Sequence, residues 1–131
     1  MMKTRIAVID DDADLRKALC WMLRVEGFEV SGFPDAREAI SQIEGGLPLD
    51  LILLDLMMPH MNGWEFCEYR AQSSVLKKVP VIVITARQSI VPPTDVSEIL
   101  LKPFDPQVLL DAIGRVRPGG SDATTEKTER Q

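Results

Sequence analysis

The chain has 131 residues, of which 45% are hydrophobic, and this suits one compact domain with a substantial core. Its formal net charge of −5 argues against nucleic-acid binding by this domain alone, because phosphate backbones are bound by basic surfaces. Every apolar run is far shorter than a bilayer span and the N-terminus lacks the architecture of a signal peptide, so we expect no contact with a membrane.

The two cysteines, Cys20 and Cys67, lie far apart on expected helices. Their spacing matches neither a metal site nor a redox motif. We therefore expect two reduced, partly buried thiols in a cytoplasmic protein, because disulfides are rare in reducing compartments.

The first half of the chain alternates short β-branched runs with helical patterns. Residues 4–9 predict a strand, and apolar residues then recur at helical spacing up to Gly27, which is placed as a C-terminal cap. Residues 28–33 predict a second strand. A second helix is expected between residues 34 and 45, where a pair of glycines stops it.

Residues 50–65 carry the most information. The apolar run 51–54 is too short for an ordinary helix, and it is typical of a strand covered on both faces of a parallel sheet. Asp55 follows directly. Because a carboxylate inside a buried strand is strongly unfavourable, we place Asp55 where that strand ends. The Asn62-Gly63 pair then turns the chain into a helix expected to reach about residue 73.

Two further strands and a helix complete the pattern. Residues 79–84 predict a strand that ends at Thr85, and residues 97–101 predict a strand that ends at Lys102. A last helix is expected to begin at Pro106. The composition then shifts to Pro, Gly, Ser, Thr and charged residues, so we expect a domain of residues 1–117 and a disordered tail of residues 118–131.

Strands that alternate with helices predict an α/β protein with a doubly wound parallel sheet and right-handed crossovers. One connection is unusual, because only residues 86–96 separate the fourth strand from the fifth and they include Pro92-Pro93. A parallel crossover needs about a dozen residues, and adjacent prolines break a helix. We expect the fourth crossover helix to be short, displaced or absent.

Four of the five expected strands end in polar residues: Asp10 and Asp11, Asp55, Thr85, and Lys102. The carboxyl ends of parallel strands meet at one edge, so these groups should share a pocket. Three neighbouring carboxylates repel each other unless a cation balances them, and oxygen ligands suit Mg²⁺. Lysine and threonine can hold phosphoryl oxygens, and a carboxylate can attack phosphorus. The sequence therefore predicts Mg²⁺-assisted phosphorylation of Asp55.

The motifs Ile-Asp-Asp-Asp, Leu-Leu-Asp-Leu-Met-Met-Pro-His-Met-Asn-Gly, Ile-Thr-Ala and Leu-Lys-Pro-Phe stand at these four strand ends. Together they resemble the receiver domain of two-component response regulators, over roughly residues 3–117. The resemblance implies a flavodoxin-like, five-stranded parallel sheet of order 2-1-3-4-5. It also implies that Mg²⁺ (or Mn²⁺ in its place) is held by Asp10, Asp11, Asp55 and the backbone carbonyl of Met57.

The resemblance makes Asp55 the phosphoacceptor, with Thr85 and Lys102 in contact with the phosphoryl group and a cis peptide between Lys102 and Pro103. It implies a signalling module rather than an enzyme with a separate substrate. The phosphoryl group would come from a sensor histidine kinase or a histidine phosphotransfer protein, and slow self-dephosphorylation would remove it. The resulting change of conformation would control an output partner.

Two departures from the family pattern concern the switch. Ile99 stands where an aromatic residue is common three positions before the lysine, and the usual Gly-Ala pair before that strand is missing. With the shortened crossover, they predict a non-standard readout at the face normally built from the fourth helix, fifth strand and fifth helix. Met57 and Arg87, two positions after Asp55 and Thr85, flank the phosphoryl group and are expected to tune its lifetime.

Two alternatives stay open. The chain could be a receiver-like protein-binding module that is never phosphorylated. It could also be a phosphatase similar to the haloacid dehalogenase group, with Asp10 as nucleophile and Asp12 as acid/base, although Asp14 stands where a threonine or valine is expected and Asp55 is left without a role. Trp21 and Trp64 are interpreted as partly buried packing residues.

Overall fold

The structure is a computed structural model that describes residues 3–116. Its five parallel strands form one sheet in the order β2-β1-β3-β4-β5, which confirms the predicted α/β architecture and strand order. The strands are β1 (Arg5–Ile9), β2 (Glu29–Phe33), β3 (Leu51–Asp55), β4 (Val81–Thr85) and β5 (Glu98–Leu101).

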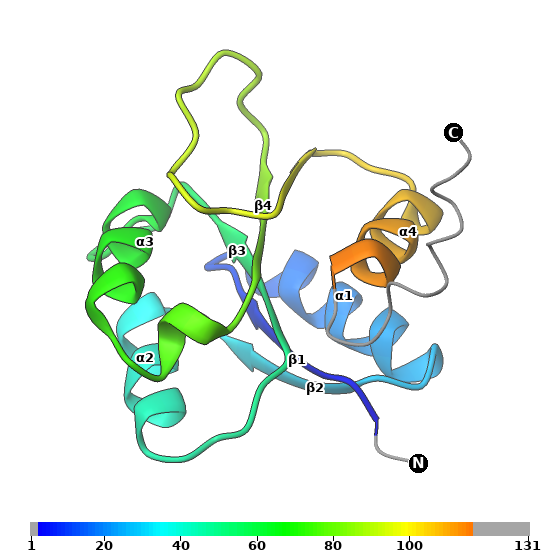
Figure 1. Ribbon diagram of the computed structural model, residues 1–131. Helices are drawn as coiled ribbons and strands as arrows, with labels where there is room; N and C mark the ends of the chain where they lie inside the picture. The colour runs from blue at the N-terminus through cyan, green and yellow to red at the C-terminus, as the bar shows by residue number, and fades with distance from the viewer. Residues whose placement is uncertain (1–2, 117–131) are drawn as a thin grey trace.

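Helices cover both faces of the sheet. Within residues 3–116 they are α1 (Ala13–Val25), α2 (Ala36–Glu44), α3 (Gly63–Gln72), the 3-10 helix η1 (Leu76–Lys78) and α4 (Pro106–Val116). Figure 1 shows α2 and α3 on one face and α1 and α4 on the other, and each pair packs over its own core cluster. The sequence did not predict η1, because a single short turn leaves no periodic pattern.

The central strands explain why the core has two halves. Every side chain of β3 and β4 is buried. Successive side chains of a strand point to opposite faces, so Ile52 and Leu54 join the cluster under α2 and α3, while Leu51 and Leu53 join the cluster under α1 and α4. The strands run in one direction, so their carboxyl ends all emerge at the same rim.

Local capping places the helices beside that rim. Asp12 caps the first turn of α1 immediately after β1, and Asn62 and Glu65 form a reciprocal capping box at the start of α3. Gly63 permits α3 to begin this close to β3, because a Cβ added there would lie 2.8 Å from the Cα of Leu56. The chain therefore turns from each of these strands into a helix within a short loop.

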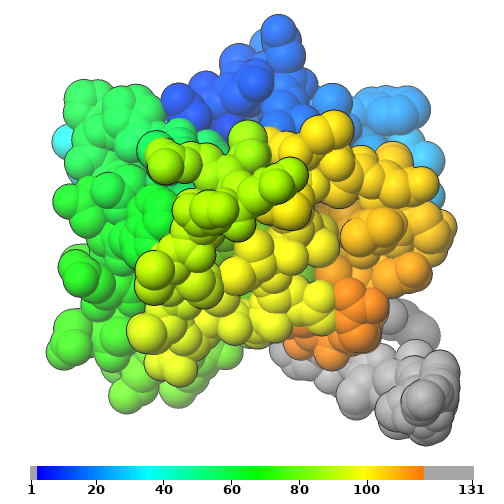
Figure 2. All heavy atoms as spheres, turned by 90° about the horizontal axis from the view of Figure 1, so that it is seen from above, coloured from blue at the N-terminus to red at the C-terminus, as the bar shows by residue number. Residues whose placement is uncertain are grey.

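The connection from β4 to β5 contains no helix over residues 86–97, which confirms the expectation drawn from its prolines. Seen from above, this connection crosses the middle of the face between the α3 side and α4 (Figure 2). The indole N–H of Trp64 on α3 donates to the carbonyl of Val91 at 2.8 Å. Ile99 and Leu101 of β5 remain 39% and 44% exposed, since no helix covers them.

Two expectations about side chains have different outcomes. Trp64 is half-buried as expected, but Trp21 is 69% exposed, so its interpretation as a partly buried packing residue was wrong. The buried face of α1 consists of Leu19, Cys20 and Leu23, and Trp21 points away from it. The tail of residues 118–131 lies outside the described residues. None of the helices within residues 3–116 has the length and apolarity needed to traverse a bilayer.

Candidate functional site

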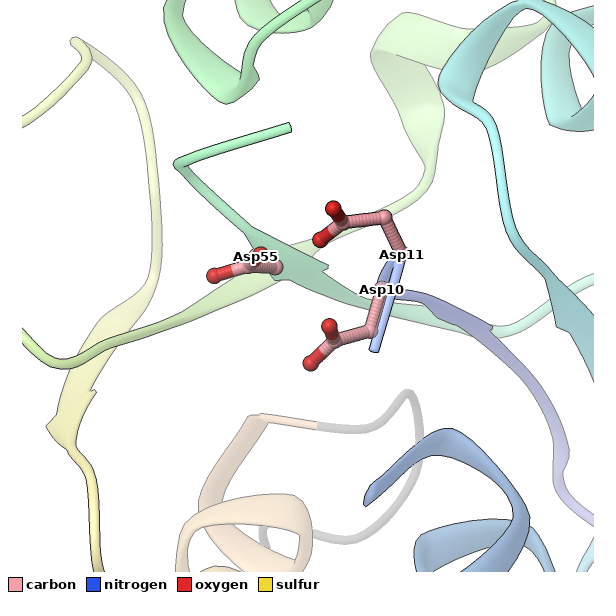
Figure 3. Close-up of side chains that lie close together, drawn as sticks. All are labelled: Asp10, Asp11 and Asp55. Atoms are coloured by element: carbon pink, nitrogen blue, oxygen red, sulfur yellow. The ribbon is translucent and has the colours of Figure 1, made fainter. Parts of the chain in front are cut away.

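Three carboxylates meet at the rim where β1 and β3 end. Asp10 and Asp11 directly follow β1, and Asp55 is the last residue of β3. The strands are neighbours in register, with Ile9 opposite Leu54, so the side chains extend from adjacent strand ends toward a shared space (Figure 3). Each can offer one oxygen within 4.8 Å of the other two. The predicted convergence of these residues is what the structure shows.

Lys102 links the two buried carboxylates of this group. Its Nζ donates to Oδ2 of Asp10 at 3.1 Å and to Oδ1 of Asp55 at 3.4 Å. The lysine reaches the pocket from the end of β5, where its backbone N–H donates to the carbonyl of Thr85 at 2.8 Å. The following peptide bond, to Pro103, is cis, as the resemblance leads us to expect.

The charges of the pocket shift the pKa of two groups. Burial and the neighbouring negative charge of Asp10 raise the pKa of Asp55 to about 6, although Lys102 acts in the opposite direction. Burial alone would lower the pKa of Lys102, but the charges of Asp55 and Asp10 and their hydrogen bonds outweigh it, so that pKa is raised. The lysine therefore stays positive beside a carboxylate that is held partly protonated near pH 6.

The other predicted residues, Thr85, Met57 and Ile99, lie on different elements around the three carboxylates. Thr85 is fully buried at the end of β4, one residue beyond the partner of Asp55 in the sheet, and its Oγ1 accepts from the backbone N–H of Arg87 at 3.2 Å. Met57 lies in the loop after β3 and is 47% exposed. Ile99 is opposite Val83 within the strand pair, so it belongs to the sheet edge rather than to the pocket.

Two features around the pocket were not predicted. Arg16 of α1 donates from Nη1 to the backbone carbonyl of Asp10 at 2.7 Å, a contact that depends on how α1 packs and leaves no pattern in the sequence. A groove of about 680 Å³ also opens beside Lys102, between α1 and the start of α4. Its walls are mostly apolar and include Trp21 and Phe104, so the exposed tryptophan lies next to the site.

The donor set fits a hard divalent cation. Carboxylate oxygens are the ligands that Mg²⁺ prefers, and a small number of them, completed by water, is its usual protein environment. The three carboxylates lie close enough to share one ion, and Asp11 is exposed, which leaves the pocket open on one side. The fold and the site thus define an acidic pocket that could hold a cation, with an adjacent lysine, at the strand ends of a doubly wound sheet.

Comparison with known proteins agrees with this geometry. The family model described as the response regulator receiver domain matches residues 6–114. The DNA-binding response regulator MtrA of Mycobacterium tuberculosis is 38% identical over 122 residues, covering 88% of this chain and 50% of the relative. The phosphate regulon transcriptional regulatory protein PhoB of Escherichia coli K12 is 32% identical over 120 residues, covering 88% and 52%. The chain spans about half the length of these curated relatives.

Solved structures show the same fold. The chemotaxis protein CheY4 of Vibrio cholerae superposes with a TM-score of 0.78 at 30% identity, covering 88% of this chain and 99% of that one. A response regulator receiver protein from Pseudomonas putida gives 0.80 at 25% identity, covering 88% and 98%. The chain belongs to the family of response-regulator receiver domains, which are signalling modules of two-component systems. The predicted family, fold and signalling function are confirmed.

Proposed function

We propose that the chain accepts a phosphoryl group on Asp55 and that this modification switches its surface. The observation that carries the proposal is the meeting of Asp10, Asp11 and Asp55 around one space, with the ammonium of Lys102 between two of them. A carboxylate oxygen of Asp55 attacks the phosphorus of a phosphohistidine, an O–P bond forms, and the N–P bond breaks to leave the histidine side chain. The acceptor must be ionised to attack.

The surrounding residues have distinct proposed roles. Asp10, Asp11, Asp55 and the carbonyl of Met57 would hold Mg²⁺, or Mn²⁺ in its place, and the ion supplies positive charge against the repulsion between carboxylates and phosphoryl oxygens. Lys102 already contacts an oxygen of Asp55, so it needs only a small movement to contact a phosphoryl group bound there.

Thr85 is proposed to bind another phosphoryl oxygen and so to start the switch. Its hydroxyl accepts a hydrogen bond from the N–H of Arg87, at the beginning of residues 86–97. When the hydroxyl of Thr85 turns toward the phosphoryl group, its hydrogen bond with the N–H of Arg87 is lost. The first residues of the connection between β4 and β5 are then free to move. Since the connection has no helix and leaves Ile99 exposed, the proposed readout is non-standard. Arg87 and Met57, each two positions after Thr85 and Asp55, are proposed to flank the phosphoryl group and to affect the rate at which the aspartyl phosphate is hydrolysed.

The proposed phosphodonor is a sensor histidine kinase or a histidine phosphotransfer protein. The apolar groove beside Lys102 supports a protein donor, because it offers a contact surface next to the reacting carboxylate. Cys20 and Cys67 are both buried and unpaired, which supports the expected cytoplasmic location. The net charge of −5 argues against direct DNA contact by this domain, so a DNA-binding role like that named for MtrA would need residues outside it.

The geometry disfavours the phosphatase alternative. Asp10 is fully buried, and its carboxylate accepts from the N–H of Asp12 at 2.9 Å and from Lys102 at 3.1 Å, contacts that fix its orientation. Asp12 caps α1 and is committed to backbone N–H groups. Asp55 ends β3 beside Lys102, and its pKa is raised, which is a common mark of a functional carboxylate.

The test is phosphorylation by acetyl phosphate with Mg²⁺, followed by intact-mass measurement of the wild type and of Asp55→Asn. We expect one phosphoryl adduct in the wild type and none in the variant. An adduct retained by the variant and mapped to Asp10 would support the phosphatase instead. If acetyl phosphate gives no adduct, beryllofluoride binding is measured next, and its absence would support a binding module that is never phosphorylated.

A further inference from the structure

Asp10 is held at every polar atom. Its backbone N–H donates to the carbonyl of Phe33 at 3.1 Å, and its carboxylate accepts from Asp12 and from Lys102. The remaining group is its carbonyl oxygen, which accepts the 2.7 Å hydrogen bond from Nη1 of Arg16. This contact is the one that neither the sheet nor the acidic pocket explains.

The carbonyl of Asp10 matters because of the peptide to which it belongs. The peptide bond is planar, so this oxygen and the backbone N–H of Asp11 lie in one rigid unit. A hydrogen bond that fixes this oxygen therefore also fixes the orientation of the Asp10–Asp11 peptide plane, which contains the Cα of Asp11. Asp11 is the exposed member of the three carboxylates, and the sheet does not hold it, because β1 ends at Ile9.

The path of Arg16 is built into the fold. It lies on α1, and its side chain crosses the surface of β2 at Gly32, where a Cβ would come within 3.5 Å of its Cγ and Cδ and 3.1 Å of Sγ of Cys20. The missing side chain of Gly32 leaves room for the alkyl part of the arginine. Arg16 is half-buried, so its guanidinium reaches the carbonyl along a defined route.

We propose that Arg16 is a positioning residue for the divalent cation: it sets the plane of the Asp10–Asp11 peptide, and so holds the Asp11 carboxylate where it can share an ion with Asp10 and Asp55. This inference rests on the proposed function, since it assigns regulation of the same acidic pocket. Arg16 acts through the backbone and touches neither the ion nor the phosphoryl group.

The chain supplies a matched control for this role. Arg24 lies on the same helix and also donates to a backbone carbonyl, that of Val30 in β2, at 3.0 Å. Arg16→Met and Arg24→Met therefore remove the same kind of bond from the same helix, one beside the acidic pocket and one at the far end of α1. Arg16→Lys retains a positive donor on a flexible side chain.

The experiment is a titration of ¹⁵N-labelled protein with Mg²⁺ alone, in which the NMR signals of the backbone amides report binding. Thermal unfolding of each variant is measured in parallel. Outer contacts that orient metal ligands commonly change affinity 10- to 100-fold, so we expect Arg16→Met to weaken Mg²⁺ binding roughly 10-fold. Arg16→Lys should recover part of the loss, and Arg24→Met should bind Mg²⁺ like the wild type.

Two results would overturn the inference. One is a folded Arg16→Met variant that binds Mg²⁺ with wild-type affinity. The other is an equal loss of Mg²⁺ affinity in Arg16→Met and Arg24→Met, which would mean that Arg16 only stabilises the fold. A wild type that binds no Mg²⁺ is a different result, because it overturns the proposed function itself and this inference with it. If Arg16→Met does not fold, Arg16→Gln takes its place, because it removes the guanidinium donor and keeps a polar side chain, and wild-type Mg²⁺ affinity in that folded variant refutes the role.

Discussion

Replacing Asp55 by asparagine should stabilise the domain at neutral pH in the absence of divalent cations. Burial and the charge of Asp10 raise the pKa of Asp55 from 3.8 to about 6 in the folded state. The unfolded chain keeps the ordinary value, so between these two pKa values the folded state binds more protons than the unfolded state, and stability falls as the pH rises. A difference of roughly 2 in pKa corresponds to about 3 kcal/mol, which is the largest gain expected from Asp55→Asn at pH 7.

The pH dependence separates this electrostatic gain from a change in packing. Urea unfolding of the wild type and of Asp55→Asn should give a stability difference near 3 kcal/mol above pH 6 that shrinks as the pH falls and reaches zero only below the unfolded-state pKa of 3.8, where the wild-type carboxyl is protonated in both states. Added Mg²⁺ should stabilise the wild type more than the variant, because ligand binding stabilises the state that binds it. A difference that is absent at pH 7, or that stays constant from pH 4 to pH 7, would refute the reasoning.

Three further substitutions test the surroundings of the site. Lys102→Met removes the ammonium shared by two buried carboxylates, so the pKa of Asp55 should rise further in a carboxyl ¹³C titration, and an unchanged value would contradict the assigned pairing. Gly63→Ala places a Cβ 2.8 Å from the Cα of Leu56, and unfolding should show a loss of about 2 kcal/mol; a neutral effect would mean that α3 shifts freely. Trp64→Phe removes the hydrogen bond to the connection between β4 and β5, which should lose about 1 kcal/mol of local stability. Faster amide exchange confined to that connection is the expected signal, and unchanged exchange would show that the bond is not needed there.

The acidic pocket could be predicted because each of its members is tied to a strand end. Asp10, Asp55 and Lys102 each follow an apolar run, and parallel pairing alone brings such positions to one rim. The absent helix between β4 and β5 could be predicted for an equally local reason, since Pro92-Pro93 interrupts a segment that is already short.

The misses concern side chains whose neighbours come from elsewhere in the chain. Trp21 was expected to be partly buried because aromatic residues usually are, yet its position on α1 directs it outward beside a groove formed with Phe104, far away in the sequence. The contact of Arg16 with the carbonyl of Asp10 depends on the packing of α1 over Gly32, and periodicity carries no information about it.

The attachment of Trp64 to Val91 has a mechanical consequence. Helix α3 starts at a capping box directly after the loop that follows Asp55, and its indole holds a stretch of chain that Thr85 also adjoins. The connection to β5 is thus held at two points, at Arg87 by the hydroxyl of Thr85 and at Val91 by the indole of Trp64. Thr85 is the last residue of β4, next to β3 in the sheet, and Trp64 belongs to the helix that follows β3. A movement of Asp55 that shifts either contact would therefore be passed to residues 87–91, so β5, although no helix covers it, stays connected to the acidic pocket.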